Sequence, residues 1–263
     1  MNNRLLLRRM QSTVNPFLDA TIAFSLLDLG LGATNVIRVR RTGGATPTER
    51  DFTATEIVDG TLTAWVGAGN DGFISIWYNL NGSNHARQTN ASNQHQIVFS
   101  GSLQSLNGNV IVDSNNSPGY DLDNTVNIKS IYHVGKIDSF SLVNYVAGNN
   151  SPTNGFFLGG NAGGVEGLGV FDGTTVLSNT DQDLNFNLNY IEIDGDVFVQ
   201  KNNVSEVNLG AFTSSNLDIN IVFGREGVLR LNSRYSIFLG YENSTRSIKD
   251  DIRAELNTLY NVY

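Results

Sequence analysis

Side chains that could bind a metal ion occur in three short polar stretches of the sequence. They are His85 and His95 around a polar loop, Asp121 and Asp123 in YDLDN, and Asp181 and Asp183 in TDQD. Imidazole nitrogens are typical zinc ligands and carboxylate oxygens are typical calcium ligands. The two histidines have no third ligand nearby in the sequence, and neither aspartate pair has the spacing of a complete calcium loop. Hydrogen bonds and turns are therefore the preferred interpretation. No metal or other cofactor is assigned, and calcium is the weaker alternative.

Aromatic rings offer a second kind of chemistry, because a ring face can stack on the C–H groups of a sugar. Trp65, Trp77 and Tyr78 are the candidates. Trp77 and Tyr78 are neighbours in FISIWY, which has the composition of a buried strand. Successive side chains of a strand point to opposite faces. At most one of these two rings can therefore face a groove, and its neighbour belongs to the core.

Short apolar segments bounded by Gly, Asn, Asp and Ser must position these residues. The chain holds 27 glycines and 4 prolines, and about a dozen such segments recur along it. They are NVIRVR, FISIWY, QIVFS, NVIVD, VNIKSIYHV, DSFSLVNYV, GFFLG, GLGVFD, NYIEI, DVFVQ, DINIVFG and YSIFLGY. This pattern predicts many short strands joined by turns, arranged as a two-sheet sandwich. In NYIEIDGDVFVQ, the Asp194-Gly195 pair predicts a hairpin between residues 190–193 and 197–200, with one face in the core.

Helices are expected only at the two ends of the chain. PFLDATIAFSLLDLG predicts a helix that stops at Gly30. STRSIKDDIRAELNTLYNVY places Ile248, Ile252, Leu256 and Leu259 on one stripe, and Ser247 and Asp250 have the spacing of a capping box. No internal repeat or disordered linker is evident. The sequence therefore indicates one domain, residues 17–263, preceded by an appendage, residues 1–16.

Charge and composition exclude several classes of protein. The formal net charge is −8, which disfavours nucleic acid as a partner because phosphate binding requires clustered Lys and Arg. The absence of cysteine excludes disulfides and thiolate metal sites. The amino-terminal MNNRLLLRRM is too short in its apolar part for a signal peptide, and no later stretch is long enough to span a bilayer.

The amino-terminal residues differ in charge from the rest of the chain. Residues 1–41 contain six arginines and two aspartates. Three leucines lie beside three arginines in NRLLLRRM: Arg4, Leu5, Leu6, Leu7, Arg8 and Arg9. This small amphipathic unit predicts a docking arm that buries its leucines against a neighbouring subunit. An ordinary solvated helix is the alternative.

Four segments together resemble a known family. They are IRVRRTGG, then WVGAGNDGFISIWYNLNGSNHARQT with QHQIVFSG, then NYIEIDGD, and finally IKDDIRAELNTLYNVY. They are similar to the concanavalin A-like lectin/glucanase jelly roll, in the version related to the arabinofuranosidase B catalytic domain. Similar modules occur in bacteriophage tail and capsid accessory proteins. The resemblance covers roughly residues 17–263 and implies an all-β, two-sheet antiparallel jelly-roll sandwich.

The resemblance also implies candidate site residues. In the arabinofuranosidases a glutamate after a glycine-rich turn is the nucleophile, and GNAGGVEGLGVFDG offers Glu166. An aspartate after a glycine pair is the acid, and VFGREG offers Glu226. Against catalysis, the family's WYDQSGNGNHATQ becomes WYNLNGSNHARQ here, so Asn79 replaces the aspartate, and the family's vicinal cysteines are missing. An amide cannot exchange the proton that a carboxylate can.

The leading hypothesis is a structural and interaction protein of a bacteriophage particle, located in the virion and made in the host cytoplasm without a signal peptide. It would decorate the capsid or tail, form an oligomeric assembly with other virion proteins through its arm, and stabilise the particle or bind host polysaccharide. Trp77, Asn79, Asn81 and His85 are the expected sugar-binding residues, although the three polar ones could equally hold the turn. A retaining glycoside hydrolase and a free lectin are the alternatives. An enzyme is the less favoured class, and no membrane contact is expected.

Overall fold

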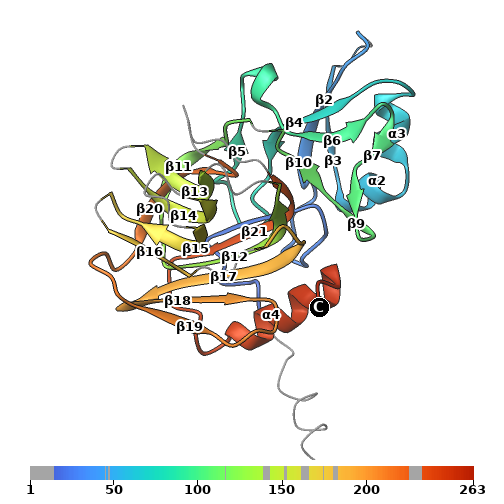
Figure 1. The fold of residues 1–263 in the computed structure, drawn as a ribbon. Coiled ribbons are helices and arrows are strands. Elements are labelled where there is room, and N and C mark those ends of the chain that lie inside the picture. Colours follow the sequence, from blue (N-terminus) through green and yellow to red (C-terminus); the bar gives the residue numbers. More distant parts are fainter. Residues whose placement is uncertain are drawn as a thin grey trace, which may run out of the picture.

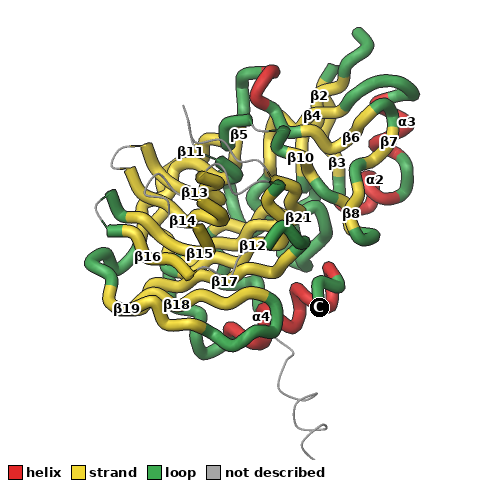
Figure 2. The backbone as a smooth tube through the Cα atoms, viewed as in Figure 1, coloured by secondary structure: helices red, strands yellow, loops and turns green. Residues whose placement is uncertain are grey.

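The structure is a computed structural model in which about half of the described residues form strands (Figures 1 and 2). It describes residues 15–44, 46, 48–115, 117–138, 143–150, 153–160, 166–173, 175–179, 183–224 and 233–263. The expected all-β class is confirmed.

Short strands come first along the chain, and longer ones follow. The short ones are β1 (Ile22–Ser25), β2 (Ile37–Arg41), β3 (Glu49–Phe52), β4 (Gly72–Trp77), β5 (Ala86–Arg87), β6 (Gln96–Phe99), β7 (Ser102–Leu103), β8 (Ser105–Leu106), β9 (Asn109–Val110) and β10 (Val112–Asp113). The later ones are β11 (Tyr120–Ile128), β12 (Ser130–Ile137), β13 (Val143–Asn150), β14 (Thr153–Gly160), β15 (Glu166–Phe171), β16 (Val176–Asn179), β17 (Asn187–Asp194), β18 (Asp196–Lys201), β19 (Val207–Ala211), β20 (Leu217–Val222) and β21 (Ser233–Tyr241).

All described strand pairs are antiparallel, and apart from the β8–β9 pair they form one connected network. One side of it runs β19–β18–β17–β12–β21, with β1 and β10 both beside β21. The other side runs β16–β15–β14–β13–β20–β11. Strand β4 joins the two sides through β5 and β6. Because β15 and β16 also contact β17, β18 and β19, the large sheet nearly closes into a barrel.

One hydrophobic cluster fills the interior and takes residues from both sides of this network. Val39 of β2, Leu168 of β15 and Leu239 of β21 all belong to it and are fully buried. At its centre Phe223 stacks on Tyr235, with 4.2 Å between ring centroids. Phe223 has a φ of 58°, which is uncommon for a residue other than glycine.

The predicted amino-terminal helix is wrong. Residues 22–25 form β1, which pairs with residues 237–240 of β21. All four residues of β1 are buried, so the segment shows no polar alternation that would distinguish a strand from a buried helix. Tertiary pairing with β21 decides the conformation.

Helices are also not confined to the ends of the chain. Two short helices, α2 (Ala54–Val58) and α3 (Thr61–Val66), follow β3. A capping box begins α2, because Thr53 Oγ1 accepts from the Glu56 amide at 3.2 Å and Glu56 Oε2 accepts from the Thr53 amide at 3.0 Å. The short 3-10 helix η1 (Ala91–Asn93) follows β5.

The carboxy-terminal helix is confirmed as α4 (Lys249–Tyr260), which packs against β17 (Figure 1). Ile252 and Leu256 are fully buried, and Ile248 and Leu259 pack against the same core. The predicted capping box is wrong, because Ile248 occupies the N-cap position and no side chain caps the helix. Among the described residues no helix has the length and hydropathy needed to cross a membrane.

The predicted hairpin is confirmed, with Ile193 opposite Val197 and Gly195 at a φ of 74° in the turn. Both of its faces are buried, so Glu192 lies inside the molecule with 0% exposure. The expected segment VNIKSIYHV is divided at Lys129: β11 pairs with β20, whereas β12 pairs with β17 and β21. The chain therefore crosses between the two sides of the network at this residue.

Candidate functional site

Trp77 lies in the core and offers no ring face to a sugar. Its side chain has 0% exposure, and its ring lies 5.1 Å from Phe223 and 6.0 Å from Tyr235 between centroids. Tyr78 points to the opposite side and is half-buried, as the strand alternation predicts. The assignment of Trp77 to sugar binding is therefore corrected to a packing role.

Asn79 and Asn81 connect residues 18–23 to the segment that follows β4. Asn79 Oδ1 accepts from the amides of Ala23 at 2.8 Å and Asn81 at 3.2 Å. Asn81 Nδ2 donates to the carbonyls of Leu18 at 2.8 Å and Ala20 at 2.7 Å. Asn79 is 3% exposed, so its amide has no surface for a ligand. These hydrogen bonds favour the turn-holding role over sugar binding.

His85 belongs to the same loop and has a fixed tautomer. Its Nδ1 accepts from the Asn79 amide at 3.1 Å, so the ring proton is on Nε2 when the ring is neutral. Burial and the nearby Arg87 guanidinium lower the pKa of His85 despite the opposing effect of Asp123. The neutral ring packs edge-on against Tyr78, with 5.0 Å between centroids.

The aspartates considered for calcium are engaged differently. Asp123 binds Arg87 in two hydrogen bonds of 2.6 and 3.2 Å, and Asp183 binds Asn187 and Lys201. Asp181 lies outside the described residues. His95 is fully buried, and its Nε2 lies 2.9 Å from the carbonyl oxygen of Pro118. Within the described residues, no group of three His, Asp or Glu side chains could hold a metal ion.

Of the two candidate catalytic glutamates, only Glu166 belongs to the described residues. Glu166 is the first residue of β15 and lies opposite Gly160 of β14, and Glu226 lies outside the described residues. The arm residues Arg4, Leu5, Leu6, Leu7, Arg8 and Arg9 also lie outside them. The roles of Glu166 as nucleophile and Glu226 as acid therefore stay predictions.

A polar cleft, which we call the amide cleft, lies beside the loop that follows β5. It consists of two adjoining hollows of about 210 Å³ and about 270 Å³, both lined by Gln88 and Thr89. The smaller hollow is also lined by Asn90, Asn93, Pro118, Gly119, Asp121 and Ile221. The larger is also lined by Glu49, Ser75, Ile76, Arg87 and Gln94.

Hydrogen bonds fix the loop 88–94 that separates the hollows. Gln88 donates through Nε2 to the Gly119 carbonyl at 2.7 Å, and its backbone amide donates to the Ser75 carbonyl at 3.0 Å. Gln94 donates through Nε2 to the Gln88 carbonyl at 2.9 Å. Arg40 donates to Gln94 Oε1 at 2.7 Å and to the Ala91 carbonyl at 3.1 Å. The cleft is thus preformed by side chains from three separate parts of the chain.

The floor of the smaller hollow is supported from the core by His95. The His95 backbone amide donates to the Tyr120 hydroxyl at 2.9 Å, and its Nδ1 lies 2.5 Å from the Tyr235 hydroxyl. Burial lowers the pKa of His95 to about 4, so the ring is neutral at pH 7. Gly119 lies where a Cβ atom would be 2.4 Å from the Val222 carbonyl oxygen, which only glycine tolerates.

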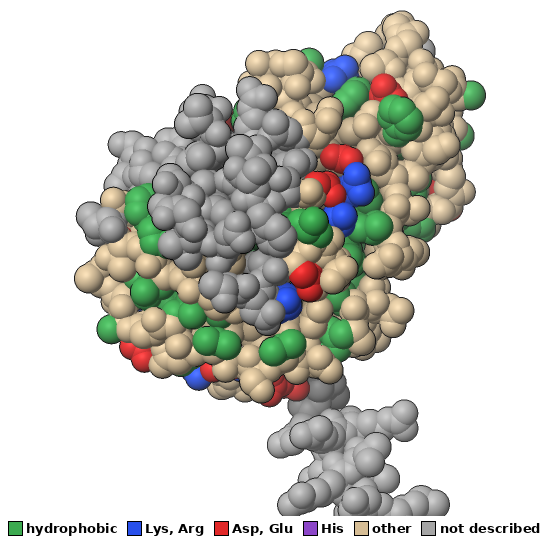
Figure 3. Space-filling model, viewed as in Figure 1, with side chains coloured by type: hydrophobic (Ala, Val, Ile, Leu, Met, Phe, Trp, Pro, Cys, Tyr) green, Lys and Arg blue, Asp and Glu red, His purple; other side chains and the backbone are tan. Residues whose placement is uncertain are grey.

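Two arginines of this region, Arg38 and Arg87, form ion pairs with aspartates. Arg38 binds Asp51 through two hydrogen bonds of 2.7 and 3.0 Å, and Tyr78 donates to the same carboxylate at 2.7 Å. The Arg38 guanidinium holds the pKa of Asp51 below its usual value. Burial and the Asp51 carboxylate raise the pKa of Tyr78 to about 12. In the view of Figure 3, charged side chains of opposite sign lie next to each other on the described surface.

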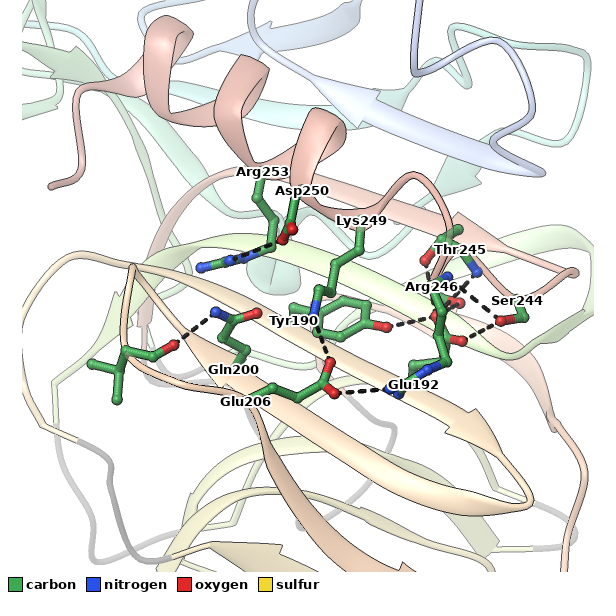
Figure 4. Close-up of polar contacts among 12 residues, drawn as sticks. Tyr190, Glu192, Gln200, Glu206, Ser244, Thr245, Arg246, Lys249, Asp250 and Arg253 are labelled. Carbon is green, nitrogen blue, oxygen red and sulfur yellow. Dashed lines mark hydrogen bonds and ion pairs between the residues drawn. The ribbon is translucent and has the colours of Figure 1, made fainter. Parts of the chain in front are cut away.

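A second polar cluster lies under α4 (Figure 4), and we call it the Glu192 cluster. Glu192 Oε2 accepts from the hydroxyls of Ser130 at 2.8 Å, Tyr190 at 2.6 Å and Thr245 at 2.9 Å. The Thr245 amide donates to it at 3.0 Å, and Ser244 donates to Oε1. Burial raises the pKa of Glu192, but these hydrogen bonds outweigh burial and hold the pKa below its ordinary value.

The surroundings of the Glu192 cluster indicate a structural role. Glu206 binds Arg246 at 3.0 Å and Lys249 at 2.6 Å, which ties the start of α4 to the segment before β19 (Figure 4). The Arg246 guanidinium lies 3.7 Å from the centroid of the Phe198 ring. Since Glu192 is fully buried and its oxygens accept five hydrogen bonds, the carboxylate is used to fix the chain ahead of α4.

Sequence reasoning did not single out the residues that form the amide cleft. A signal is present in ARQTNASNQHQ, where five amide side chains follow directly after NLNGSNH. Amide-rich stretches are also typical of turns. The hollows appear only when β3, β4 and β11 come together around this stretch.

Comparisons with known proteins give no family assignment. No family model matches the chain, and no curated protein matches it. Among solved structures, the chain is similar to a Trypanosoma rangeli sialidase in complex with sialic acid, with 11% sequence identity and a TM-score of 0.40. The match covers 92% of this chain and 38% of that one. Similarity at this level assigns neither a family nor an activity.

Proposed function

We propose that the chain is a lectin-like, carbohydrate-binding β module whose sugar site is the amide cleft. The observation that carries this proposal is the preformed pair of hollows lined by amide, hydroxyl and carboxylate groups. Sugar hydroxyls both donate and accept hydrogen bonds, and such side chains provide both partners. A small number of fixed polar groups in a concave site is the usual basis of small-ligand recognition.

The polar groups are also held in place before any ligand arrives. The side-chain amides of Gln88 and Gln94 donate hydrogen bonds that fix the loop. The loop is therefore ordered before a ligand binds. Preorganisation of this kind reduces the entropic cost of binding. Within the part of the chain that the structure describes, Asn93 Oδ1 accepts from the neighbouring Ser92 hydroxyl alone, at 3.4 Å, so the Asn93 amide can turn toward a ligand.

A glycan array followed by isothermal titration tests the proposal, with Asn93→Ala as the cleft variant. We expect the variant to weaken binding by about tenfold, the effect of about 1.4 kcal/mol. Asn127→Ala is the matched control, because Asn127 is an exposed amide on β11 that does not line the cleft. An array without a single binder, or equal losses in both variants, would contradict the assignment of the site.

The wider role follows from the sequence. The proposed fold is a concanavalin A-like jelly roll, and the module is carried on a bacteriophage particle, anchored to neighbouring virion proteins through residues 1–16. The resemblance of IRVRRTGG and WYNLNGSNHARQ to phage modules and the arginine-leucine arm support this role. Deletion of residues 2–12 should abolish incorporation into particles while leaving glycan binding intact. Unchanged incorporation would refute the arm's role and leave the sugar site standing.

A further inference from the structure

We propose that Asn107, in the turn between β8 and β9, is a covalent modification site at which the side-chain amide is converted spontaneously to a carboxylate. The only co-reactant is water. The Gly108 backbone nitrogen loses its proton and attacks the Asn107 Cγ atom, the Cγ–Nδ2 bond breaks, and the leaving group takes up a proton and departs as ammonia. Water then opens the resulting succinimide ring at one of its two carbonyls, which gives aspartate or isoaspartate. The proposal does not depend on the sugar site, because Asn107 does not line the amide cleft.

Three asparagines of the chain are followed by glycine, namely Asn81, Asn107 and Asn154. Glycine favours this reaction because it has no side chain to hinder the attacking nitrogen and because its backbone adopts many conformations. The sequence does not distinguish the three positions. The structure does, since ring closure requires a side chain and a backbone that are free to rotate.

Asn81 is restrained through the atom that would have to leave. Its Nδ2 donates to the carbonyls of Leu18 at 2.8 Å and Ala20 at 2.7 Å. Both hydrogen bonds must break before ammonia can depart. The contacts that connect residues 18–23 to the segment after β4 therefore also protect Asn81 from the reaction.

Asn154 is restrained by its strand. It is 5% exposed and lies within β14, opposite Asn149 of β13. A Cβ atom on Gly148 would lie 2.5 Å from the Asn154 carbonyl oxygen, so the two backbones are in close contact. Rotation of the Asn154 backbone toward ring closure would break this strand pairing, so Asn154 is protected as well.

Asn107 has neither restraint. Asn107 and Gly108 are both exposed, and their φ angles of 51° and 80° are those of a two-residue hairpin turn of type I′. Within the described part of the chain, the Asn107 side chain makes no hydrogen bond. No heavy atom lies within 4 Å of the Cβ position of Gly108, so the turn has room to rotate until the Gly108 nitrogen faces Cγ.

The hairpin around Asn107 is also small enough to open. Strands β8 and β9 pair only with each other in the described sheets and contribute two residues each. An isolated pair of such short strands is marginally stable, and local opening of this kind costs little free energy. The attacking geometry is therefore accessible without unfolding of the core.

The modification should loosen the contact between this hairpin and the end of α4. Asn109 Nδ2 donates to the Tyr260 carbonyl at 2.7 Å, and Asn109 lies opposite Leu106 across the turn. Isoaspartate lengthens the backbone of the turn by one carbon atom, which the register of a two-residue turn does not accommodate. Aspartate keeps the backbone length and should have the smaller effect.

Peptide mapping by mass spectrometry tests the proposal on the full chain, incubated at mildly alkaline pH in water enriched in heavy oxygen, which labels each new carboxyl group. In the folded chain we expect Asn107 to react at least about tenfold faster than Asn81, since two lost hydrogen bonds account for a factor of about this size. Asn154 should be slow as well. In the urea-unfolded chain the three sites should react at similar rates, because glycine follows each of them.

Asn107→Gln is the matched variant, because it keeps the amide but would have to close a larger ring. We expect this variant to lose the fast conversion, and we expect the wild-type chain alone to decline in thermal stability as isoaspartate accumulates. Equal rates at the three sites of the folded chain, or no reaction at Asn107 while the unfolded chain reacts, would overturn the proposal. An unchanged unfolding midpoint after conversion would overturn the effect on the hairpin and α4 and leave the modification site standing.

Discussion

The Glu192 cluster and the amide cleft are both rich in polar side chains, yet they differ in how completely those side chains are paired. Five protein groups donate hydrogen bonds to the Glu192 carboxylate, which is fully buried. The cleft is open, and within the described residues the Asn93 Oδ1 atom that lines it has one hydrogen bond, of 3.4 Å, to the neighbouring Ser92 hydroxyl. A carboxylate that is buried and saturated fixes a fold, whereas polar groups with unused capacity around an open hollow are available to a ligand.

In enzymes, a buried carboxylate with an altered pKa is often taken as a candidate for the active site. The Glu192 cluster shows that such a carboxylate can be structural. The pKa of Glu192 is lowered by the hydrogen bonds that hold the segment 244–245 in place. Structural polar networks shift pKa values as active sites do. Accessibility and unused hydrogen-bonding capacity therefore separate the two regions better than a pKa does.

The largest expected effect comes from removing the saturated carboxylate. Glu192→Ala leaves the hydroxyls of Ser130, Tyr190 and Ser244 and the Thr245 amide without their acceptor, in the interior. We expect a loss of about 3–5 kcal/mol in the free energy of unfolding, measured by urea denaturation. Glycan affinity of the remaining folded protein should not change. A loss below about 1 kcal/mol would show that the cluster is not structural.

A substitution at the cleft floor should affect both stability and binding. Gly119→Ala places a Cβ atom 2.4 Å from the Val222 carbonyl oxygen and 2.9 Å from the Gly224 amide nitrogen. The backbone must shift, at a cost of about 1–3 kcal/mol, and the smaller hollow changes shape. Gly108→Ala is the control, since no heavy atom lies within 4 Å of its Cβ and only its φ of 80° opposes the change. Weakened glycan binding in the control alone would contradict the location of the site.

Two buried histidines, His95 beneath the cleft and His133, predict a dependence of stability on pH. Burial lowers the pKa of His95 to about 4 and that of His133 to about 3. The unfolded chain therefore binds more protons than the folded chain below about pH 6.5, so stability falls as the pH is lowered from 6.5 toward 4. Each histidine contributes a slope of up to about 1.4 kcal/mol per pH unit. Urea denaturation at several pH values measures it.

A substitution of His133 tests whether a side chain without a hydrogen-bond partner has a functional role for that reason alone. Neither of its ring nitrogens has a hydrogen-bond partner, and the residue is fully buried, away from the cleft lining. His133→Leu should reduce the pH slope, leave stability at pH 7 unchanged or improved, and leave glycan binding unaffected. A drop in glycan affinity would mean that unpaired groups matter even without an opening.

The smallest expected effect concerns the ion pairs at the start of α4. Glu206→Gln weakens the contacts with Arg246 and Lys249, which are partly exposed. We expect a loss of less than about 1 kcal/mol that decreases further at high salt. Thermal denaturation at two ionic strengths measures it. A loss of unfolding free energy as large as that of Glu192→Ala would show that Glu206 is as important for stability as the Glu192 cluster.

The sequence predicted the strands better than it predicted the site. Alternating or β-branched segments such as FISIWY and NYIEI are strands, because their local preference agrees with the sheet that they join. Residues 22–25 were predicted as helix because a fully buried strand has the same uniform apolar pattern as a buried helix. The short helix α2 has a local signal in the capping box of Thr53 and Glu56, but it is only five residues long and lies among strand-like segments.

The site was less predictable because it is made by distant segments. Asn79 and Asn81 lie in the loop before the cleft, not in the cleft itself. Asn79 accepts from the Ala23 amide, and Asn81 donates to the carbonyls of Leu18 and Ala20. These contacts depend on the position of residues 18–23, which no local pattern predicts. The cleft lies only a few residues further on. Its walls come from β3, β4 and the start of β11, which no spacing within one segment could have revealed.

The pairing of β1 with β21 determines when the protein can fold during its synthesis. The Ser25 and Tyr260 hydroxyls, 235 positions apart, share a hydrogen bond of 3.0 Å. At a synthesis rate of roughly 5–20 residues per second, β21 and Tyr260 are made about 10–50 s after β1. During this time IAF is an apolar segment without a neighbour, so we expect the nascent chain to depend on chaperones and to complete its central sheet only after release of residues 237–260 from the ribosome.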